Sequence, residues 1–207
     1  MGAALRRCRC GESASGCAGR GALGVAARGQ RGSGSGGPTR GSLPGRGATM
    51  AASREDLERM MFFEQARDQA EAEWKANHND AQALTRWGGA MLELSQYRHG
   101  PEAVDMIEMA VSKFEMALKI NPRKHDALWC LGNALTSQGF LFPEPDRAQS
   151  FFDRAKTCFE RALREEPTNE VYKKSLEMTA RAPGLHAELQ VQLAQQQAQQ
   201  QQQQQQQ

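Results

Sequence analysis

The chain has 207 residues, of which 39% are hydrophobic and 24% are charged, and its formal net charge is +2. These averages hide an uneven distribution, because residues 1–50 hold 14 of the 20 glycines and eight arginines but only one acidic residue, Glu12. Without that segment the chain carries 18 basic and 23 acidic side chains, a net charge of −5. The positive overall charge therefore does not indicate a nucleic-acid-binding protein.

Both ends of the chain differ in composition from its middle. Residues 1–53 are rich in glycine and arginine, and residues 190–207 hold 14 glutamines and no charge. Neither end has enough apolar surface to offset the entropy of ordering it. We expect a disordered extension over 1–53, a folded domain over 54–185 and a glutamine-rich tail over 186–207. For the extension, a targeting signal and nonspecific contact with polyanions stay open as alternatives.

No part of the sequence predicts an enzyme, a metal site or a cofactor. The four histidines are isolated, no glycine-rich phosphate loop occurs, and Cys8 and Cys10 lack a nearby histidine that would complete a zinc site. An odd count of five cysteines without a regular framework favours a reducing compartment over a disulfide scaffold. No window of 18 apolar residues is present, so we expect no transmembrane helix in this chain.

The middle of the chain has the pattern of consecutive helices. Clusters of glycine, proline and asparagine divide it into six predicted helices, over about 54–76, 80–97, 102–120, 125–139, 146–165 and 168–182. The first helix carries an apolar stripe of Phe62, Phe63, Ala66, Ala70 and Trp74. Pro183 is expected to end the last helix, which would cap the stack, and the glutamine tract either extends that helix or stays disordered.

Two motifs recur in this region at nearly the same spacing. Residues 84–90 match 128–134 at an offset of 44, with the pattern Leu-x-x-(Trp/Leu)-Gly-x-Ala. Residues 114–122 match 159–167 at an offset of 45, with Phe-x-x-Ala-Leu and a closing proline. Small residues on one helix let the phenylalanine of the next helix approach closely, as in tetratricopeptide hairpins. We therefore predict an all-α, tetratricopeptide-like stack of two elongated repeats with flanking helices, the extra residues lying between the two helices of each repeat.

Several blocks within the repeats are more specific than the repeat pattern itself. They are Trp-Gly-Gly-Ala at 87–90, Ala-Leu-Lys-Ile-Asn-Pro at 117–122, Asp-Ala-Leu-Trp-Cys-Leu-Gly-Asn-Ala at 126–134 and Tyr-Lys-Lys-Ser-Leu at 172–176. In this order, over about 56–190, the chain resembles the plant-type presequence receptor of the mitochondrial outer-membrane translocase, its twenty-kilodalton subunit.

The resemblance implies a receptor on the cytosolic face of the mitochondrial outer membrane. It would bind the basic, amphipathic presequences of precursor proteins and act together with other translocase subunits. The family is held in the membrane by a C-terminal helix, for which residues 186–207 contain no counterpart, so an anchorless, soluble cytosolic form is the other expectation.

A peptide would dock on the first helix of each repeat, which lines the concave side of such stacks. Taking Ala81 and His125 as the first repeat positions, the predicted peptide-binding residues are Thr85, Gly89, Leu92, Glu93, Trp129, Asn133 and Thr136. This set combines apolar surface with one acid, which suits a basic peptide with one apolar side. For Trp129, plain packing in the core is the alternative. A co-chaperone or an assembly scaffold that binds other peptides stays open as a second function, although a carboxylate clamp needs basic residues at these positions.

Overall fold

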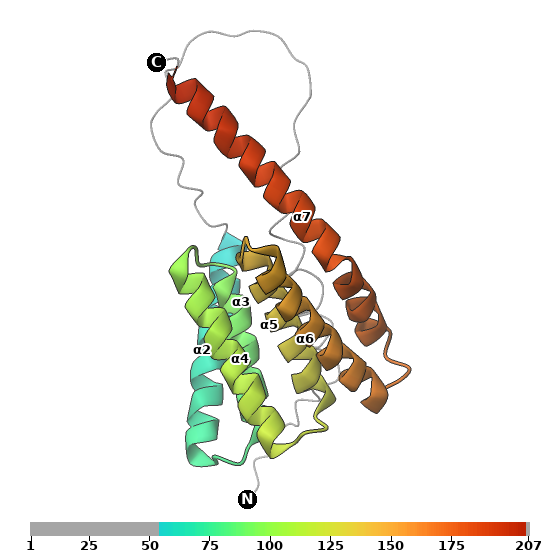
Figure 1. Ribbon diagram of the computed structural model, residues 1–207. Coiled ribbons are helices and arrows are strands. Elements are labelled where there is room, and N and C mark those ends of the chain that lie inside the picture. The colour runs from blue at the N-terminus through green and yellow to red at the C-terminus, as the bar shows by residue number, and fades with distance from the viewer. Residues whose placement is uncertain (1–53, 206–207) are drawn as a thin grey trace, which may run out of the picture.

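The computed structural model describes residues 54–205, and this part of the chain consists of six helices joined by short loops (Figure 1). The helices are α2 (Arg54–Ala76), α3 (Ala81–Ser95), α4 (Pro101–Ile120), α5 (His125–Leu141), α6 (Pro145–Glu165) and α7 (Glu170–Gln205). The predicted all-α fold is confirmed, and the first five helices begin and end within about two residues of the predicted positions. The predicted disorder of residues 1–53 lies outside the described residues.

The helix boundaries follow from local chemistry. Asp80 caps α3, because its carboxylate accepts hydrogen bonds from the backbone N–H groups of Gln82 and Ala83 at 2.8 and 2.9 Å. Asn169 caps α7 in the same way. Helices α4 and α6 both begin with a proline, which has no N–H to leave unsatisfied in the first turn.

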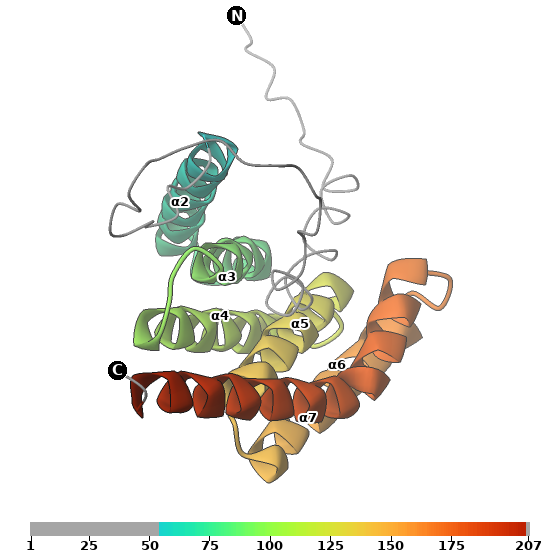
Figure 2. The same cartoon turned by 90° about the horizontal axis from the view of Figure 1, so that it is seen from above.

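Each helix packs against the next along the chain, so that α3 with α4 and α5 with α6 form two antiparallel hairpins (Figures 1 and 2). Helix α2 covers the outer side of the first hairpin, and α7 packs on α6 and crosses α5. Helices α3 and α5, the first helices of the two repeats, are also in contact with each other. The structure thus has the neighbour pattern of a tetratricopeptide-like stack.

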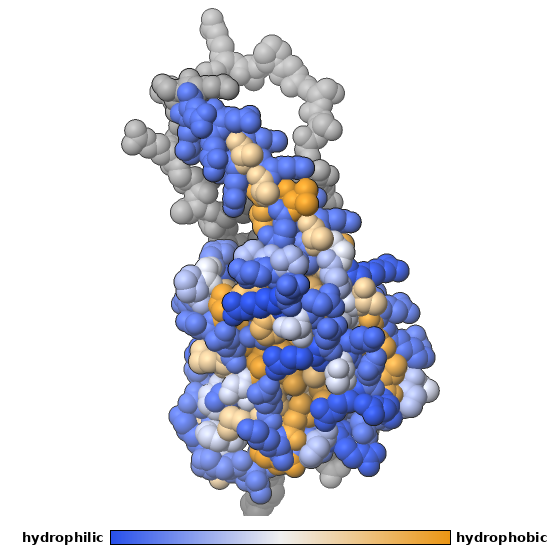
Figure 3. Space-filling model, viewed as in Figure 1, coloured by the Kyte–Doolittle hydropathy of each residue, from blue (hydrophilic) through white to orange (hydrophobic). Residues whose placement is uncertain are grey.

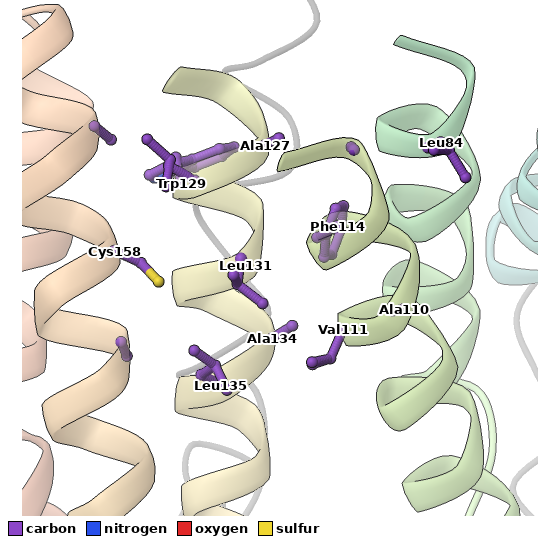
Figure 4. Close-up of a cluster of buried hydrophobic side chains, with 14 of the residues drawn as sticks. Leu84, Ala110, Val111, Phe114, Ala127, Trp129, Leu131, Ala134, Leu135 and Cys158 are labelled. Carbon is purple, nitrogen blue, oxygen red and sulfur yellow. The ribbon is translucent and has the colours of Figure 1, made fainter. Parts of the chain in front are cut away.

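The core between the hairpins is built from the residues that recur in the sequence. Phe114 of α4 and Phe159 of α6 are fully buried. A β-carbon placed on Gly88 would lie 2.8 Å from the Phe114 ring, so only glycine allows this approach. In Figure 4, Phe114 lies between α3 and α5, and Cys158 of α6 points toward α5. The sequence motif is therefore a packing motif.

The apolar stripe predicted for α2 is only partly buried. Ala70 lies in the core and Trp74 packs partly against it, with its ring centroid 5.7 Å from that of Trp87. Phe62, in contrast, is 63% exposed, so its predicted place on the packing face is wrong. Phe62 and Phe63 are adjacent in the chain and therefore point about 100° apart on a helix, and only one of them can face the core.

Helix α7 continues through Pro183 to Gln205, so the prediction that it ends at residue 182 is wrong. Packing on both sides of the proline holds the helix together: Ala182 is buried against Phe152, and Nε2 of His186 donates a hydrogen bond to the carbonyl of Phe142 at 2.8 Å. The expected boundary between 185 and 186 falls inside this helix. From residue 191 onward α7 projects from the stack with its side chains exposed, and hydrophobic residues are visible along this helix in Figure 3. None of the helices within 54–205 is both long and apolar enough to cross a membrane.

Candidate functional site

The seven residues predicted to bind peptide lie on α3 and α5. The two helices are joined at their starts, where Nζ of Lys124 donates a hydrogen bond to the Gln82 side chain. The sequence analysis predicts that these two helices line the concave side of the stack, and they are in contact with each other. The accessibility of each residue decides which part of this surface is available to a ligand.

On α3, three of the four predicted residues are accessible. Gly89 is half-buried, and a β-carbon added to it would meet no atom within 4 Å. Leu92 is half-buried and packs against the core with one side, and Glu93 is half-buried one position later. Thr85 is buried, and its hydroxyl donates to the carbonyl of Ala81 at 2.7 Å, so its predicted accessibility is wrong. Gly89, Leu92 and Glu93 thus form an open surface, here called the α3 face.

On α5 the predicted surface is mostly covered. Trp129 is only 2% exposed, and its indole Nε1–H donates a hydrogen bond to the hydroxyl of Ser175 in α7 at 2.9 Å. Thr136 is buried as well, and its hydroxyl donates to the carbonyl of Gly132. The predicted exposure of these two side chains is therefore wrong, and for Trp129 the cover is the start of α7. Asn133, which is half-buried, is the remaining accessible residue on this helix.

Tyr172 fixes the start of α7 against α5. Its hydroxyl and Nδ1 of His125 are hydrogen bonded at 2.8 Å, and its ring centroid lies 6.0 Å from that of Trp129. Burial raises the pKa of the Tyr172 phenol well above its usual range, and the negative charge of Glu166 adds to this rise. The phenol therefore stays neutral at physiological pH and holds α7 in place over Trp129.

A separate cavity of about 270 Å³ lies where the loop after α4 meets α6. It is lined by Pro122, Arg123, Leu128, Arg161, Arg164 and Glu165, and by none of the seven predicted residues. The guanidinium of Arg123 donates to both carboxylate oxygens of Glu165, and Nη2 of Arg161 donates to the carbonyl of Pro122. The first of these hydrogen bonds is the main reason that the pKa of Glu165 lies below its usual value. All of these hydrogen bonds join residues of this chain. They hold the loop after α4 against α6, so the cavity lies at a structural contact between helices.

The sequence analysis missed one set of exposed apolar residues. Leu57, Met61 and Phe62 of α2 are 45%, 65% and 63% exposed. The helical pattern placed Phe62 on the packing side and gave no reason to single out the other two. Such a surface is identified by the exposure of three neighbouring large apolar side chains. This exposure can be seen only once the packing of α2 is known.

No cluster of three metal-ligating side chains occurs in the part of the chain that the structure describes. Cys158 is buried, and burial raises the pKa of its thiol, which makes it a poor nucleophile. The described surfaces of α2 and α3 thus offer apolar side chains, charged side chains and an open space above Gly89.

Comparison with known proteins places the fold in one family. The profile of the family described as plant specific mitochondrial import receptor subunit TOM20 matches residues 57–207. Mitochondrial import receptor subunit TOM20-3 of Arabidopsis thaliana is 51% identical over 133 residues, which cover 64% of this chain and 66% of the relative. TOM20-2 and TOM20-4 of the same organism are 47% and 48% identical, with 66% and 68% of their lengths covered. The chain thus spans about two thirds of the length of these relatives.

Proposed function

Because the chain belongs to the family of the plant-specific mitochondrial import receptor subunit TOM20, we propose that it is a receptor subunit of the protein import translocase at the cytosolic face of the mitochondrial outer membrane. Its ligands would be the basic, amphipathic presequences of precursor proteins, and its partners the other translocase subunits. The family is a receptor family, and the proposed activity is binding without catalysis.

The observation that carries this proposal is the open α3 face, which lies on the first helix of the first repeat, within the residues that match the family. An amphipathic helix binds by placing its apolar side on an apolar surface, and Leu92 supplies such a surface. Gly89 leaves space for the ligand to approach the α3 backbone closely, since nothing lies within 4 Å of its β-position. Glu93 provides a negative charge at the edge, where a lysine or arginine of the peptide would lie.

The proposed groove is smaller than the sequence predicts, since α7 covers Trp129 and the Thr136 side chain is buried. Asn133 of α5 remains at its border and can hydrogen-bond to the peptide backbone. A small surface with one acid and one large apolar residue supports a Kd on the order of micromolar or weaker. Such an affinity suits a receptor that passes each ligand on.

An NMR titration of the full ¹⁵N-labelled chain tests this proposal. The probe is a synthetic helix-forming peptide with leucines on one side and arginines on the other, and the control is the same composition in scrambled order. The proposal predicts that the backbone amide signals of residues 89, 92 and 93 shift with the amphipathic peptide and far less with the scrambled one. Equal shifts with both peptides, or no shift at these residues, would contradict it.

A further inference from the structure

The start of α2 presents an apolar surface that the described part of the chain leaves uncovered. Leu57 and Met61 are one helical turn apart on the same side of the helix, Phe62 points about 100° further round it, and all three side chains are exposed. We call this surface the outer α2 face. It includes the two most exposed large hydrophobic side chains of residues 54–205, Met61 and Phe62.

The charge on α2 is also distinct. This helix has seven acidic and four basic residues, a net charge of −3, whereas residues 51–207 together carry −5. By comparison, α3 and α7 have no net charge, and α5 carries −1. Helix α2 therefore carries more net negative charge than any other of the six described helices, and more than α3, which holds the α3 face.

Acidic side chains flank the outer α2 face along the helix. Glu58 follows Leu57, and it is 64% exposed although it pairs with Arg54 at 2.8 Å. Glu64 lies two residues after Phe62 and is 38% exposed, with Arg98 at 3.6 Å. Exposed pairs of this kind contribute little and exchange easily, so that a basic ligand can compete for either carboxylate.

From this combination we infer that the outer α2 face is a second docking surface, which binds the apolar side of a basic amphipathic helix. The inference rests on the proposed function and adds a second site to it. Methionine and phenylalanine suit ligands of varied sequence, because the flexible thioether of Met61 adapts its shape and the Phe62 ring supplies apolar area. Arginines or lysines on the edge of the ligand would pair with Glu58 and Glu64.

Charge distinguishes this occupant from a second copy of the same chain. Two copies that met through this face would bring together two helices that each carry −3, and their repulsion opposes such a dimer. A basic helix has the complementary charge and is attracted by the negative electrostatic potential of α2. The attraction should weaken with salt, because the Debye length falls from about 10 Å at 0.1 M to about 3 Å at 1 M.

Methyl NMR of the full chain with ¹³C-methyl-labelled methionine tests the inference. The probe is the arginine-leucine peptide described above, carrying a nitroxide spin label, and its scrambled form is the control. Met109 of α4 serves as an internal reference, because it is an exposed methionine, 47% accessible, on another helix. The inference predicts strong broadening of the Met61 methyl signal and little broadening of the Met109 signal.

Variants then separate this site from the α3 face. Met61→Gln and Phe62→Gln remove apolar surface from exposed positions, so the fold should be retained, and each should raise the Kd of the peptide about three- to tenfold. The matched control Met109→Gln should leave the Kd within about twofold.

The inference is overturned if the Met61 signal responds no more than the Met109 signal, or if Met61→Gln and Phe62→Gln bind as the parent chain does. It is also overturned if these variants change the sedimentation of the free chain without changing its peptide affinity, since the face would then bind a second copy. If the α3 variant Leu92→Glu still weakens binding in any of these cases, the proposed function stands while the second site does not. If the full chain fails to bind the peptide at all, both fall.

Discussion

The ring of Phe159 in α6 lies directly against the backbone of Gly132 in α5, so closely that a β-carbon at position 132 would be 2.5 Å from Cε1 of the ring. Phe114 and Gly88 repeat this contact in the first hairpin. Gly132 lies 44 residues after Gly88, and Phe159 lies 45 residues after Phe114. These separations are the two offsets of the sequence repeat. One steric relationship thus sets the spacing of both hairpins.

Gly132→Ala is expected to destabilise the domain. The added methyl group has to displace the buried Phe159 ring, and overpacking of this kind costs about 1–3 kcal/mol. The measurement is urea unfolding of the full chain followed by circular dichroism at 222 nm.

Gly89→Ala is the matched control, because it makes the same change on the equivalent type of helix where no atom lies within 4 Å. Replacing glycine by alanine inside a helix is favourable by about 0.5–1 kcal/mol, so this variant should be as stable as the parent or more stable. Equal stability of the two variants would contradict the packing role of Gly132.

Ser175→Ala is expected to loosen α7 from α5. The substitution leaves the buried Nε1–H of Trp129 without an acceptor, at a cost of about 1–3 kcal/mol in the free energy of unfolding. Ser137→Ala is the control, because the Ser137 hydroxyl bonds only to a carbonyl of its own helix, that of Asn133. Its effect should stay within about 0.5 kcal/mol. A Ser175→Ala variant as stable as the control would show that this hydrogen bond does not hold α7.

The position of Trp129 shows why the fold was easier to predict than the site. The packing pairs such as Gly132 with Phe159 are local to each hairpin, so helical spacing alone identifies them. The cover over Trp129 depends on the path of α7 across α5, which is set by contacts of Ser175 with Trp129 and of Tyr172 with His125, at separations of 46 and 47 residues. Nothing in the spacing of the α5 residues encodes that contact.

The end of α7 was mispredicted for a related reason. Proline inside a helix costs about 3 kcal/mol, which justifies expecting an end before Pro183. Tertiary packing offsets this cost: Ala182 is buried, and His186 donates to the carbonyl of Phe142. A helix propensity rule considers neither of these contacts.

The pKa of Glu165 should rise when its partner is removed. In Arg123→Gln the main hydrogen bonds to this carboxylate are lost, so its pKa should move up toward the ordinary value of about 4.3. The ¹³C chemical shift of the Glu165 carboxyl carbon, followed against pH, measures the change. Arg164 acts on Glu165 only through its charge, and Arg164→Gln should therefore give a smaller rise.

The sign of the matching pH dependence follows from the lowered pKa. The stabilising effect of the Arg123–Glu165 pair is present above the unfolded-state pKa of glutamate and is lost as the pH falls through the lower folded-state pKa. An equal rise in the Arg123 and Arg164 variants would contradict a specific hydrogen bond.

Gly89→Leu should block the α3 face while preserving the fold. The space above Gly89 accepts a side chain without a clash, but that side chain then fills the region where a peptide would approach. We expect the Kd of the amphipathic peptide to rise about tenfold, which corresponds to about 1.4 kcal/mol. Leu92→Glu should act in the same direction by placing a charge beneath the apolar side of the ligand. Peptide binding unchanged in Gly89→Leu would exclude the α3 face as the site.

The most direct test of the receptor role is the Kd of the full chain for a fluorescently labelled basic amphipathic peptide, measured by anisotropy beside the scrambled peptide of identical composition. The composition fixes the total charge, so that only the separation of apolar and basic sides differs between the two. The account predicts binding of the amphipathic peptide at least about tenfold tighter than that of the scrambled one, a difference of about 1.4 kcal/mol. Equal Kd values for the two peptides would contradict it.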